Sequence, residues 1–346
     1  MRLFLPFIRT EMIGILVKRF TSLIIVVIGV ISVLFAVNEM IPGDPIRALA
    51  GVQIRPEQVE VLRHEFGLDK PLYIRYLLYM SNFYRGDLGL SIMTQRPVIE
   101  DLKTYFPATL ELALYSMVCI VIIGIPLGVV SAVYKGKILD QTSRILTFIG
   151  VGLPVFWFGL MLQILFYGHV SWLPAGGRIS SGLIPPSGPT GMYLIDALLD
   201  GNLKVFLDVA KHLILPLATL VLGRIAVVAR MTRSSLLEVL GEDYIRTARS
   251  KGLSEKTVIL LHALRNAFIP TLTMIGLQFG WLLHGTLVIE SIFSFPGIGY
   301  YAIRAIIQHD LPAILGVTVV ITMMFTFINF IVDLLYTVVD PRIRAT

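Results

Sequence analysis

Residues 242–270 read EDYIRTARSKGLSEKTVILLHALRNAFIP and form a polar stretch between two long apolar segments. The stretch holds two short helical patterns that Gly252 separates. A polar helical segment between two membrane spans must face water or a partner protein, because hydrocarbon cannot solvate its charges. The stretch therefore predicts a membrane protein with a helical docking surface outside the bilayer.

The composition of the whole chain is that of a membrane protein. Of its 346 residues, 55% are hydrophobic and 15% are charged, and the mean hydropathy is +0.79. Soluble domains carry about 25% charged residues. A spanning helix needs about 20 apolar residues. We expect an all-α integral membrane protein with six spans, at residues 20–37, 110–134, 145–167, 213–228, 271–292 and 313–338.

The first apolar stretch allows two interpretations. Four cations precede it: Arg2, Arg9, Lys18 and Arg19. Such a pattern also occurs in cleaved secretory signals. The run is long for a signal, however, and the following NEMIPGDP offers no clear cleavage site between small residues. We expect a retained anchor, whereas cleavage would leave five spans.

The distribution of Lys and Arg predicts the orientation. Short cytoplasmic loops are rich in these residues. The loop after the fourth span carries seven of them: Arg230, Arg233, Arg246, Arg249, Lys251, Lys256 and Arg265. The loop after the fifth span carries only Arg304. We therefore expect both termini and the 242–270 stretch to be cytoplasmic, with Arg224 and Arg230 snorkelling to the cytoplasmic boundary.

These spans predict the domain organisation. Residues 1–19 form a cytoplasmic N-terminal segment and 339–346 a cytoplasmic tail. Residues 38–108 form an extracytoplasmic subdomain, in which Val59, Leu62 and Phe66 recur at helical spacing. The transmembrane core is 109–338. It includes a second outer loop, 168–212, and a cytoplasmic loop, 229–270.

Signatures of catalysis and of metal binding are missing from the sequence. There is no GxxxxGK[ST] phosphate loop and no GxSxG, and His64-Glu65 lacks the second His of HExxH. The six His residues lie far apart and there is one Cys. We expect no catalytic site, metal or cofactor in this chain. The net charge of +6 is spread over polar loops, so it does not indicate nucleic-acid binding.

The 242–270 stretch has the signals of two capped helices. Residues 243–250 are all compatible with a helix, Gly252 suits a left-handed turn, and Ser254 can cap the next helix. On the first helix, Tyr244, Ala248 and Lys251 are expected on one side. On the second, Val258, Leu261 and Leu264 predict an apolar stripe at spacing three. Two interpretations remain: a knob that docks in a groove of a partner, or an ordinary solvated loop.

Four polar residues inside the predicted spans are candidates for a gate or pathway: Glu290, Gln278, His284 and Gln163. An ionisable group such as Glu290 is unfavourable in a membrane unless it is paired or hydrated. The alternative is a structural carboxylate that accepts hydrogen bonds from backbone N–H groups of the FPGIG turn, 295–299. We favour that alternative. The three uncharged residues are more often interhelical hydrogen-bonding groups than pathway residues.

The 242–270 stretch resembles the signature EAA loop of the membrane subunits of ATP-binding-cassette importers. That loop has Glu-Ala-Ala, three residues, Gly, nine residues, and Ile-x-Leu-Pro. Here Arg246-Thr247-Ala248 takes the first place, Gly252 the second, and His262-Ala263-Leu264-Arg265 the third. Ala248, Gly252 and Leu264 match strictly.

The wider resemblance is to the dipeptide/oligopeptide/nickel permeases, and most to B-type dipeptide or oligopeptide permeases. It covers nearly the whole chain in order, through these stretches: IPGDP (41–45), GDLGLS (86–91), FPATLELAL (106–114), DYIRTARSKGL (243–253), HALRNAFIP (262–270), ESIFSFPGIG (290–299) and DPR (340–342). LPVFWFG (153–159) and HLILP (212–216) agree as well. The resemblance implies the type I permease fold of such importers in the cytoplasmic membrane of a prokaryote.

The resemblance also implies partners. They are a second homologous permease, two ATP-binding subunits that hold ATP and Mg, and an extracytoplasmic solute-binding protein. The residues that would couple to an ATP-binding subunit are Tyr244, Arg246, Thr247, Ala248, Lys251, Gly252, Leu253, Val258, Leu261 and Leu264. Peptides are the expected cargo; nickel, glutathione and oligosaccharides are alternatives within the family.

Two hypotheses lie outside this family. A secondary transporter would need ion-coupling charges in its spans, and the sequence offers few beyond Glu290 and Asp333. A membrane enzyme would need a nucleophile and a base, and no recognisable set is present. An ATP-driven importer remains the expectation.

Overall fold

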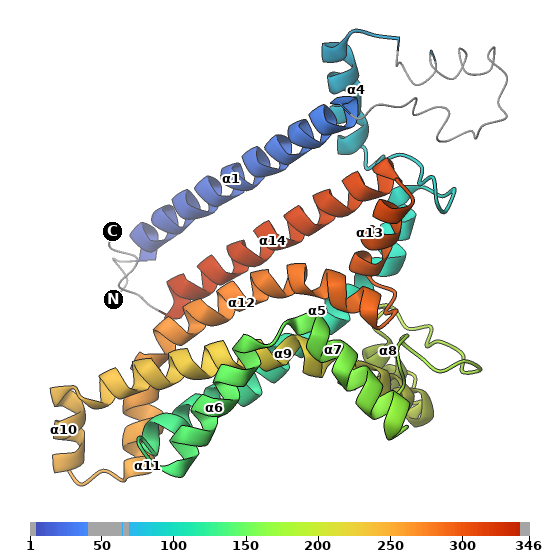
Figure 1. Ribbon diagram of the computed structural model, residues 1–346. Helices are drawn as coiled ribbons and strands as arrows, with labels where there is room; N and C mark the ends of the chain where they lie inside the picture. The colour runs from blue at the N-terminus through green and yellow to red at the C-terminus, as the bar shows by residue number, and fades with distance from the viewer. Residues whose placement is uncertain (1–4, 41–63, 65–68, 340–346) are drawn as a thin grey trace. The chain divides into compact units, whose positions relative to one another are not determined.

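The computed structural model describes residues 5–40, 64 and 69–339, and its regular structure there is helical apart from one isolated bridge between Leu90 and Pro97. The predicted all-α class is confirmed for this part of the chain (Figure 1). The elements are α1 (Leu5–Met40), α4 (Leu72–Tyr84), α5 (Val98–Val133), α6 (Ile138–Gly152), α7 (Val155–Gln163), η1 (Ile164–His169), α8 (Tyr193–Leu199), α9 (Leu203–Leu240), α10 (Asp243–Ser250), α11 (Glu255–Thr257), η2 (Val258–Ala263), α12 (Leu264–Ile292), α13 (Ile298–Ile307) and α14 (Leu311–Val339).

Several helices are long and apolar enough to cross a membrane. Four pass by length and composition: Val98–Val133, Leu203–Leu240, Glu255–Leu282 and Leu311–Ile331. A fifth is added if α6 and the following Val155–His169 count as one bent span. Within α1, Ile24–Val37 is a shorter apolar helix. The described residues thus show four or five apolar helices of spanning length.

The expected span at 145–167 is not one continuous helix, so that prediction was wrong in its geometry. The two halves meet at a bend of 100° between Gly152 and Val155. Leu153 is extended, with ψ 132°, and Pro154 follows it. A residue before proline avoids the helical region, and proline itself lacks the N–H of a helical hydrogen bond. The LPV sequence therefore breaks the span.

The chain divides into two compact units. One is Met1–Tyr105 with Tyr301–Thr326, and the other is Phe106–Tyr300 with Phe327–Thr346. In the first, Ile31, Met80 and Val319 form a small apolar core. There Phe35 packs edge-to-face on Tyr76, at 5.3 Å between ring centroids. These contacts join α1, α4 and α14 within that unit.

The second unit contains the larger core. It is centred on α5, α9 and α12, and Figure 1 shows α9 and α12 running side by side. Gly128 of α5 lies so close to α9 that a Cβ atom there would meet the Thr232 Cβ at 2.6 Å. Small residues allow such close approach of membrane helices. The α5–α9 packing therefore depends on glycine at this position.

The helix ends differ from the predicted span limits. α9 starts at Leu203 and continues to Leu240, so it includes the end of the predicted outer loop and the start of the predicted cytoplasmic loop. The helical pattern at Val59, Leu62 and Phe66 and most of the tail lie outside the described residues. The domain limits inferred from the sequence stay predictions.

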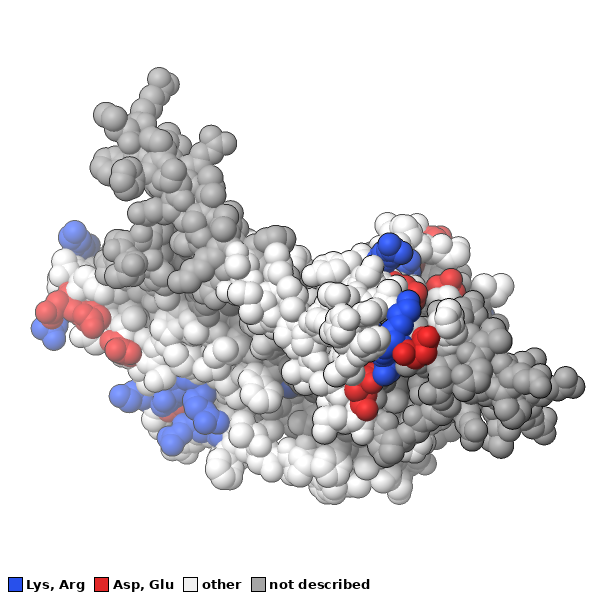
Figure 2. All heavy atoms as spheres, turned by 90° about the horizontal axis from the view of Figure 1, so that it is seen from above, with Lys and Arg blue, Asp and Glu red and all other residues white. Residues whose placement is uncertain are grey.

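Charged side chains are unevenly distributed on the surface. On the face in Figure 2, Lys, Arg, Asp and Glu gather in separate patches, and wide areas between them carry none. Charged residues are unfavourable against lipid hydrocarbon. The uncharged areas are therefore suited to contact with lipid.

Candidate functional site

The predicted docking stretch, 242–270, begins with a knob that we define as residues 242–263, and this knob has the local structure that its sequence indicates. The helix α10 covers Asp243–Ser250, as predicted. Gly252 has φ +76°, the left-handed conformation that glycine favours after a helix. The Ser254 hydroxyl accepts a hydrogen bond from the Thr257 N–H at 3.3 Å, which confirms the predicted cap.

Apolar burial fixes the knob to the bundle. Ile245 and Val258 are fully buried, and Ala248 and Ala263 lie with them against Leu236 of α9. Fully burying an isoleucine or valine contributes about 1.5–3 kcal/mol. The cluster also includes Ala132 of α5 and Ala267 of α12. A force on the knob would therefore be carried to three long helices.

Polar contacts of the knob lie at its surface. The Asn266 amide donates to the Tyr244 hydroxyl at 2.7 Å. Arg249 donates two hydrogen bonds to the Glu255 carboxylate, at 2.7 and 3.1 Å, so that α10 and α11 are linked across the Gly252 turn. The hydrogen bonds to Glu255 raise the pKa of Arg249, whose side chain is exposed.

The ten predicted coupling residues differ in their exposure. Ala248 and Val258 are buried against the bundle. Leu264 is half-buried. The other seven are exposed: Tyr244, Arg246, Thr247, Lys251, Gly252, Leu253 and Leu261. The exposed residues are available to a partner, whereas the two buried ones can act only by holding the knob in place.

Two predictions about the faces of these helices were wrong. Ala248 does not share an exposed side with Tyr244 and Lys251, because it faces the bundle. Val258 and Leu261 do not form one stripe either: Val258 is 0% exposed and Leu261 is 66% exposed. The cause is η2, a π-helical turn at Val258–Ala263. Its i→i+5 hydrogen bonds change the spacing of side chains, and the buried series is Val258, Ala263 and Ala267.

Glu290 is buried in the last turn of α12, just before the turn that leads to α13. Its carboxylate accepts hydrogen bonds from the Gly299 N–H at 2.7 Å, the Tyr300 N–H at 3.2 Å and the Thr109 hydroxyl at 2.7 Å. The Thr109 oxygen in turn accepts from the Ile298 N–H at 2.8 Å. These are free N–H groups at the start of α13, where a negative charge is favourable. The geometry favours the structural interpretation of Glu290.

A buried ion pair lies nearby that the sequence did not reveal. Arg178 donates to Glu111 at 2.5 Å, and the side chains are 6% and 0% exposed. The guanidinium lies over the Tyr193 ring at 3.6 Å and also donates to the Gly191 carbonyl. Glu111 accepts from the Leu194 N–H at 2.7 Å. The pair ties the loop between η1 and α8 to α5. A carboxylate within the apolar FPATLELAL was the only hint in the sequence.

The three uncharged pathway candidates differ in their surroundings. The Gln163 amide donates to the Ala175 carbonyl at 2.6 Å, which is a structural bond to the following loop. Gln278 accepts from the Arg224 Nη1 at 3.0 Å and lines a cavity of 410 Å³. The side chain of His284 lies outside the part of the chain that the structure describes. Of the three, Gln278 is the one that the structure places at a cavity.

Arg224 does not snorkel to the membrane boundary, so that expectation was wrong. Its guanidinium is held beside α12, by Gln278 and by the Trp281 carbonyl at 3.1 Å. Both acceptors lie inside the long α12 helix. The hydrogen bonds keep the cation at the level of the helix pair instead of letting it extend to the helix end.

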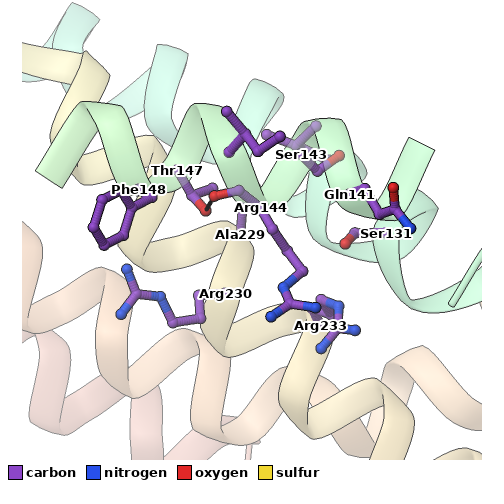
Figure 3. Close-up of a pocket in the computed structure, with 11 residues that line it drawn as sticks. Ser131, Gln141, Ser143, Arg144, Thr147, Phe148, Ala229, Arg230 and Arg233 are labelled. Carbon is purple, nitrogen blue, oxygen red and sulfur yellow. Dashed lines mark hydrogen bonds between the residues drawn. The ribbon is translucent and has the colours of Figure 1, made fainter. Parts of the chain in front are cut away.

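A second, larger cavity of 810 Å³ lies between α6 and α9. In Figure 3, Arg144 from α6 and Arg230 and Arg233 from α9 face this space. Arg233 is neutralised by Asp140 through two hydrogen bonds, of 2.8 and 2.9 Å. Asp140 also accepts from the Ser131 hydroxyl at 2.7 Å, so this carboxylate serves to hold α5, α6 and α9 together.

No cluster of three His, Cys, Asp or Glu residues suited to a metal ion occurs in the described residues. Several buried polar groups there, such as Arg178, Asp140 and Glu290, form hydrogen bonds that join separate elements.

Two family models match the chain. Residues 124–345 match the "Binding-protein-dependent transport system inner membrane component". Residues 12–113 match the "Binding-prot-dependent transport system membrane comp, N-term". Together the two matches account for most of the chain and include the knob.

Several curated proteins are similar over nearly their full length. The "Probable D,D-dipeptide transport system permease protein DdpB" of Escherichia coli K12 is 47% identical, covering 95% of this chain and 97% of that protein. The "Dipeptide transport system permease protein DppB" of the same strain is 45% identical, covering 96% and 99%. The "Glutathione transport system permease protein GsiC" of Escherichia coli O6:H1 is 38% identical, covering 96% and 99%.

One solved structure has a similar fold. It is the inward-facing MetNI methionine ABC transporter, with a TM-score of 0.51 and 18% identity, covering 67% of this chain and 93% of that chain. At this identity the similarity concerns the fold alone.

Proposed function

The chain belongs to the family of binding-protein-dependent transport system inner membrane components and is a permease subunit of an ATP-binding-cassette importer, and on that premise we propose that it carries di- and oligopeptides. The relatives at 45–47% identity are named as dipeptide or D,D-dipeptide permeases. Glutathione, which the GsiC relative is named for, is itself a short peptide. Nickel and oligosaccharides are the less supported alternatives.

The proposed assembly contains this chain, a second homologous permease, two ATP-binding subunits and an extracytoplasmic solute-binding protein. ATP and Mg are held by the ATP-binding subunits, and this chain binds no cofactor. In this proposal the chain has six spans, with both termini and the knob in the cytoplasm, in the inner membrane of a prokaryote. The four or five apolar helices of spanning length and the apolar Ile24–Val37 segment are compatible with that count.

The observation that carries the mechanism is the construction of the knob. It exposes Tyr244, Leu253 and Leu261, while Ile245 and Val258 anchor it in the bundle. An ATP-binding subunit that grips the exposed side chains would turn the anchored helices as one body. ATP binding and hydrolysis would in this way bias the permease between inward-facing and outward-facing states.

Co-purification tests the docking role directly. We expect Leu261→Glu to release the ATP-binding subunits from the purified complex and to abolish ATP-dependent dipeptide uptake in proteoliposomes, because it places a charge on an exposed apolar contact. Leu198→Glu in α8 is the matched control, since Leu198 is 67% exposed and Leu261 is 66% exposed. The control is expected to retain its ATP-binding subunits.

Two results would contradict the proposal. Retention of the ATP-binding subunits and of full uptake by Leu261→Glu would show that the knob is not their docking site. Uptake that follows an ion gradient in the absence of ATP would support a secondary transporter instead.

A further inference from the structure

Arg224 lies near the middle of the long helix α9 and is half-buried. Arg224 is 21 residues after the first residue of α9 and 16 before the last. At about 1.5 Å per residue, it is more than about 20 Å from either helix end. An ionisable residue in an apolar membrane helix is unfavourable unless it is paired or hydrated, and it is commonly functional. Its position therefore needs a reason that packing alone does not give.

The hydrogen-bond partners of Arg224 are neutral. They are the Gln278 side-chain oxygen at 3.0 Å and the Trp281 carbonyl at 3.1 Å. No carboxylate among the described residues forms an ion pair with Arg224. By contrast, Arg178 and Arg233 of the same unit each have a buried carboxylate partner, Glu111 and Asp140 respectively. Arg224 thus keeps an uncompensated positive charge.

Arg224 and Gln278 line a cavity of 410 Å³ whose other lining side chains are apolar. Cavities of about 300–1,000 Å³ with a few polar groups on an apolar wall are typical of small-molecule sites. The α6–α7 break lies on its wall, through Leu153, Pro154 and Val155. No side chain caps the N-terminus of α7. That helix end adds partial positive charge to the same cavity.

A permease that handles many peptides needs a feature that they all share. Every unmodified peptide has a C-terminal carboxylate, whatever its side chains are. A guanidinium is suited to a carboxylate because its N–H groups form two parallel hydrogen bonds to the oxygens. The apolar walls do not require hydrogen-bonding groups on the side chains of the cargo.

We propose that Arg224, assisted by Gln278, binds the C-terminal carboxylate of the peptide as the cargo crosses the membrane. This inference rests on the proposed peptide cargo. Between cargo molecules, Gln278 and the Trp281 carbonyl hold the guanidinium in place. Neutral partners of this kind can be displaced by a carboxylate, whereas a resident acidic partner would compete with it.

The experiment compares a dipeptide with its C-terminal amide. Alanyl-alanine and alanyl-alanine amide are each supplied at the same occupancy of the solute-binding protein to the complete importer in proteoliposomes, and ATP-driven uptake is measured. The preference of the solute-binding protein is the same for every permease variant. The change in the acid-to-amide uptake ratio between variants therefore reports on the permease alone.

We expect Arg224→Gln to lower the acid-to-amide ratio about tenfold, because a hydrogen-bonded charge pair with the carboxylate is lost. Arg224→Lys is expected to keep part of the preference, since it keeps the charge and loses the two-pronged geometry. Arg230→Gln is the matched control: it removes an arginine from the same helix, at an exposed position six residues further along. It is expected to leave the ratio unchanged.

Gln278→Glu tests the same idea without removing the arginine. It places a carboxylate within reach of Arg224 and neutralises the cation internally. We expect a complex that still assembles but whose acid-to-amide ratio falls to the level of Arg224→Gln. This variant also protects the test if Arg224→Gln impairs folding.

The contrary outcomes are distinct. An unchanged ratio in Arg224→Gln and Gln278→Glu, with uptake preserved, would overturn the carboxylate site and leave the peptide permease intact. Loss of the second permease from the Arg224→Gln complex, with no change of ratio in Gln278→Glu, would show that Arg224 pairs with a carboxylate of that partner, which also overturns the site. Absence of dipeptide uptake by the wild-type importer would instead overturn the proposed cargo.

Discussion

The knob and the buried polar cluster, formed by Thr109, Glu111, Arg178 and Glu290, are stabilised in opposite ways. In the cluster, the ion pair is 6% and 0% exposed, and Glu290 accepts three hydrogen bonds without contact with solvent. In the knob, the Arg249–Glu255 pair is 44% and 56% exposed, and the buried contacts are apolar.

The difference shows that the cluster serves to hold helices rigidly, whereas the knob surface is available to partner proteins. Buried polar groups must keep their partners, so the cluster fixes α5, the α12–α13 turn and the η1–α8 loop in one arrangement. The knob uses Ile245 and Val258 for attachment and leaves its polar side chains in solvent. Substitutions in the cluster should therefore act on stability, and substitutions on the knob surface should act on partners.

The largest effect is expected from Arg178→Met, which leaves Glu111 buried without a counterion. Removing one member of a buried pair destabilises a protein by about 3–5 kcal/mol. We expect a large fall in the thermal unfolding temperature of the purified chain in detergent. The double variant Arg178→Met with Glu111→Leu should recover part of that loss. A single variant as stable as the wild type would contradict the distinction between the two regions.

Glu290→Gln is expected to have the next largest effect. The amide keeps one acceptor oxygen and replaces the other by an NH2 group, which cannot accept from the N–H groups of Gly299 and Tyr300, at a cost of about 1–3 kcal/mol. We expect poorer assembly of the complex, measured by size-exclusion chromatography. Glu100→Gln, at an exposed position in the first turn of α5, is the control. Normal assembly with lost uptake would instead assign Glu290 to a gate.

Gly252→Ala should have an intermediate effect that is confined to the knob. Gly252 has φ +76°, which strains an alanine by about 1–2 kcal/mol. We expect a lower substrate-stimulated ATPase rate in the complex, with unchanged thermal stability of the bundle. Gly241→Ala is the matched control, because Gly241 ends α9 with φ −82°. Equal ATPase rates in both variants would show that the turn does not position the docking surface.

The smallest effect is expected from Glu255→Gln. Exposed ion pairs contribute about 0.2–1 kcal/mol and are screened by salt. We expect little change in the unfolding temperature of the chain, and any change should disappear at high salt. A fall in the unfolding temperature as large as that of Arg178→Met would mean that the knob depends on its surface charges for stability, as the buried cluster does.

The sequence predicted what depends on neighbouring residues. The limits of α10, the left-handed Gly252 and the Ser254 cap follow from residues within a few positions of one another. The ion pair of Glu111 with Arg178 joins residues 67 positions apart, and Arg224 meets Gln278 across 54 positions. No local pattern specifies such contacts, so they were missed or, for Arg224, predicted wrongly.

The prediction of which side chains share a face of the knob helices was wrong for a different reason. The prediction of a stripe at Val258, Leu261 and Leu264 assumed uniform α-helical spacing, and η2 departs from it. The break at Leu153–Pro154 was likewise readable from proline, yet hydropathy alone treated the segment as one span. Six spans, the orientation and the coupling roles of individual residues stay predictions.

The π-helical turn η2 can also accommodate the loss of one residue. Each i→i+5 ring encloses one residue more than an α-helical ring does, and Leu260 and Leu261 within it are exposed. Deleting one of them would let the turn close into an α-helix while α12 keeps its phase against α9. A one-residue gap between related sequences at 258–263 is therefore compatible with an identical bundle, and an alignment should place the gap inside this turn instead of shifting the buried face of α12.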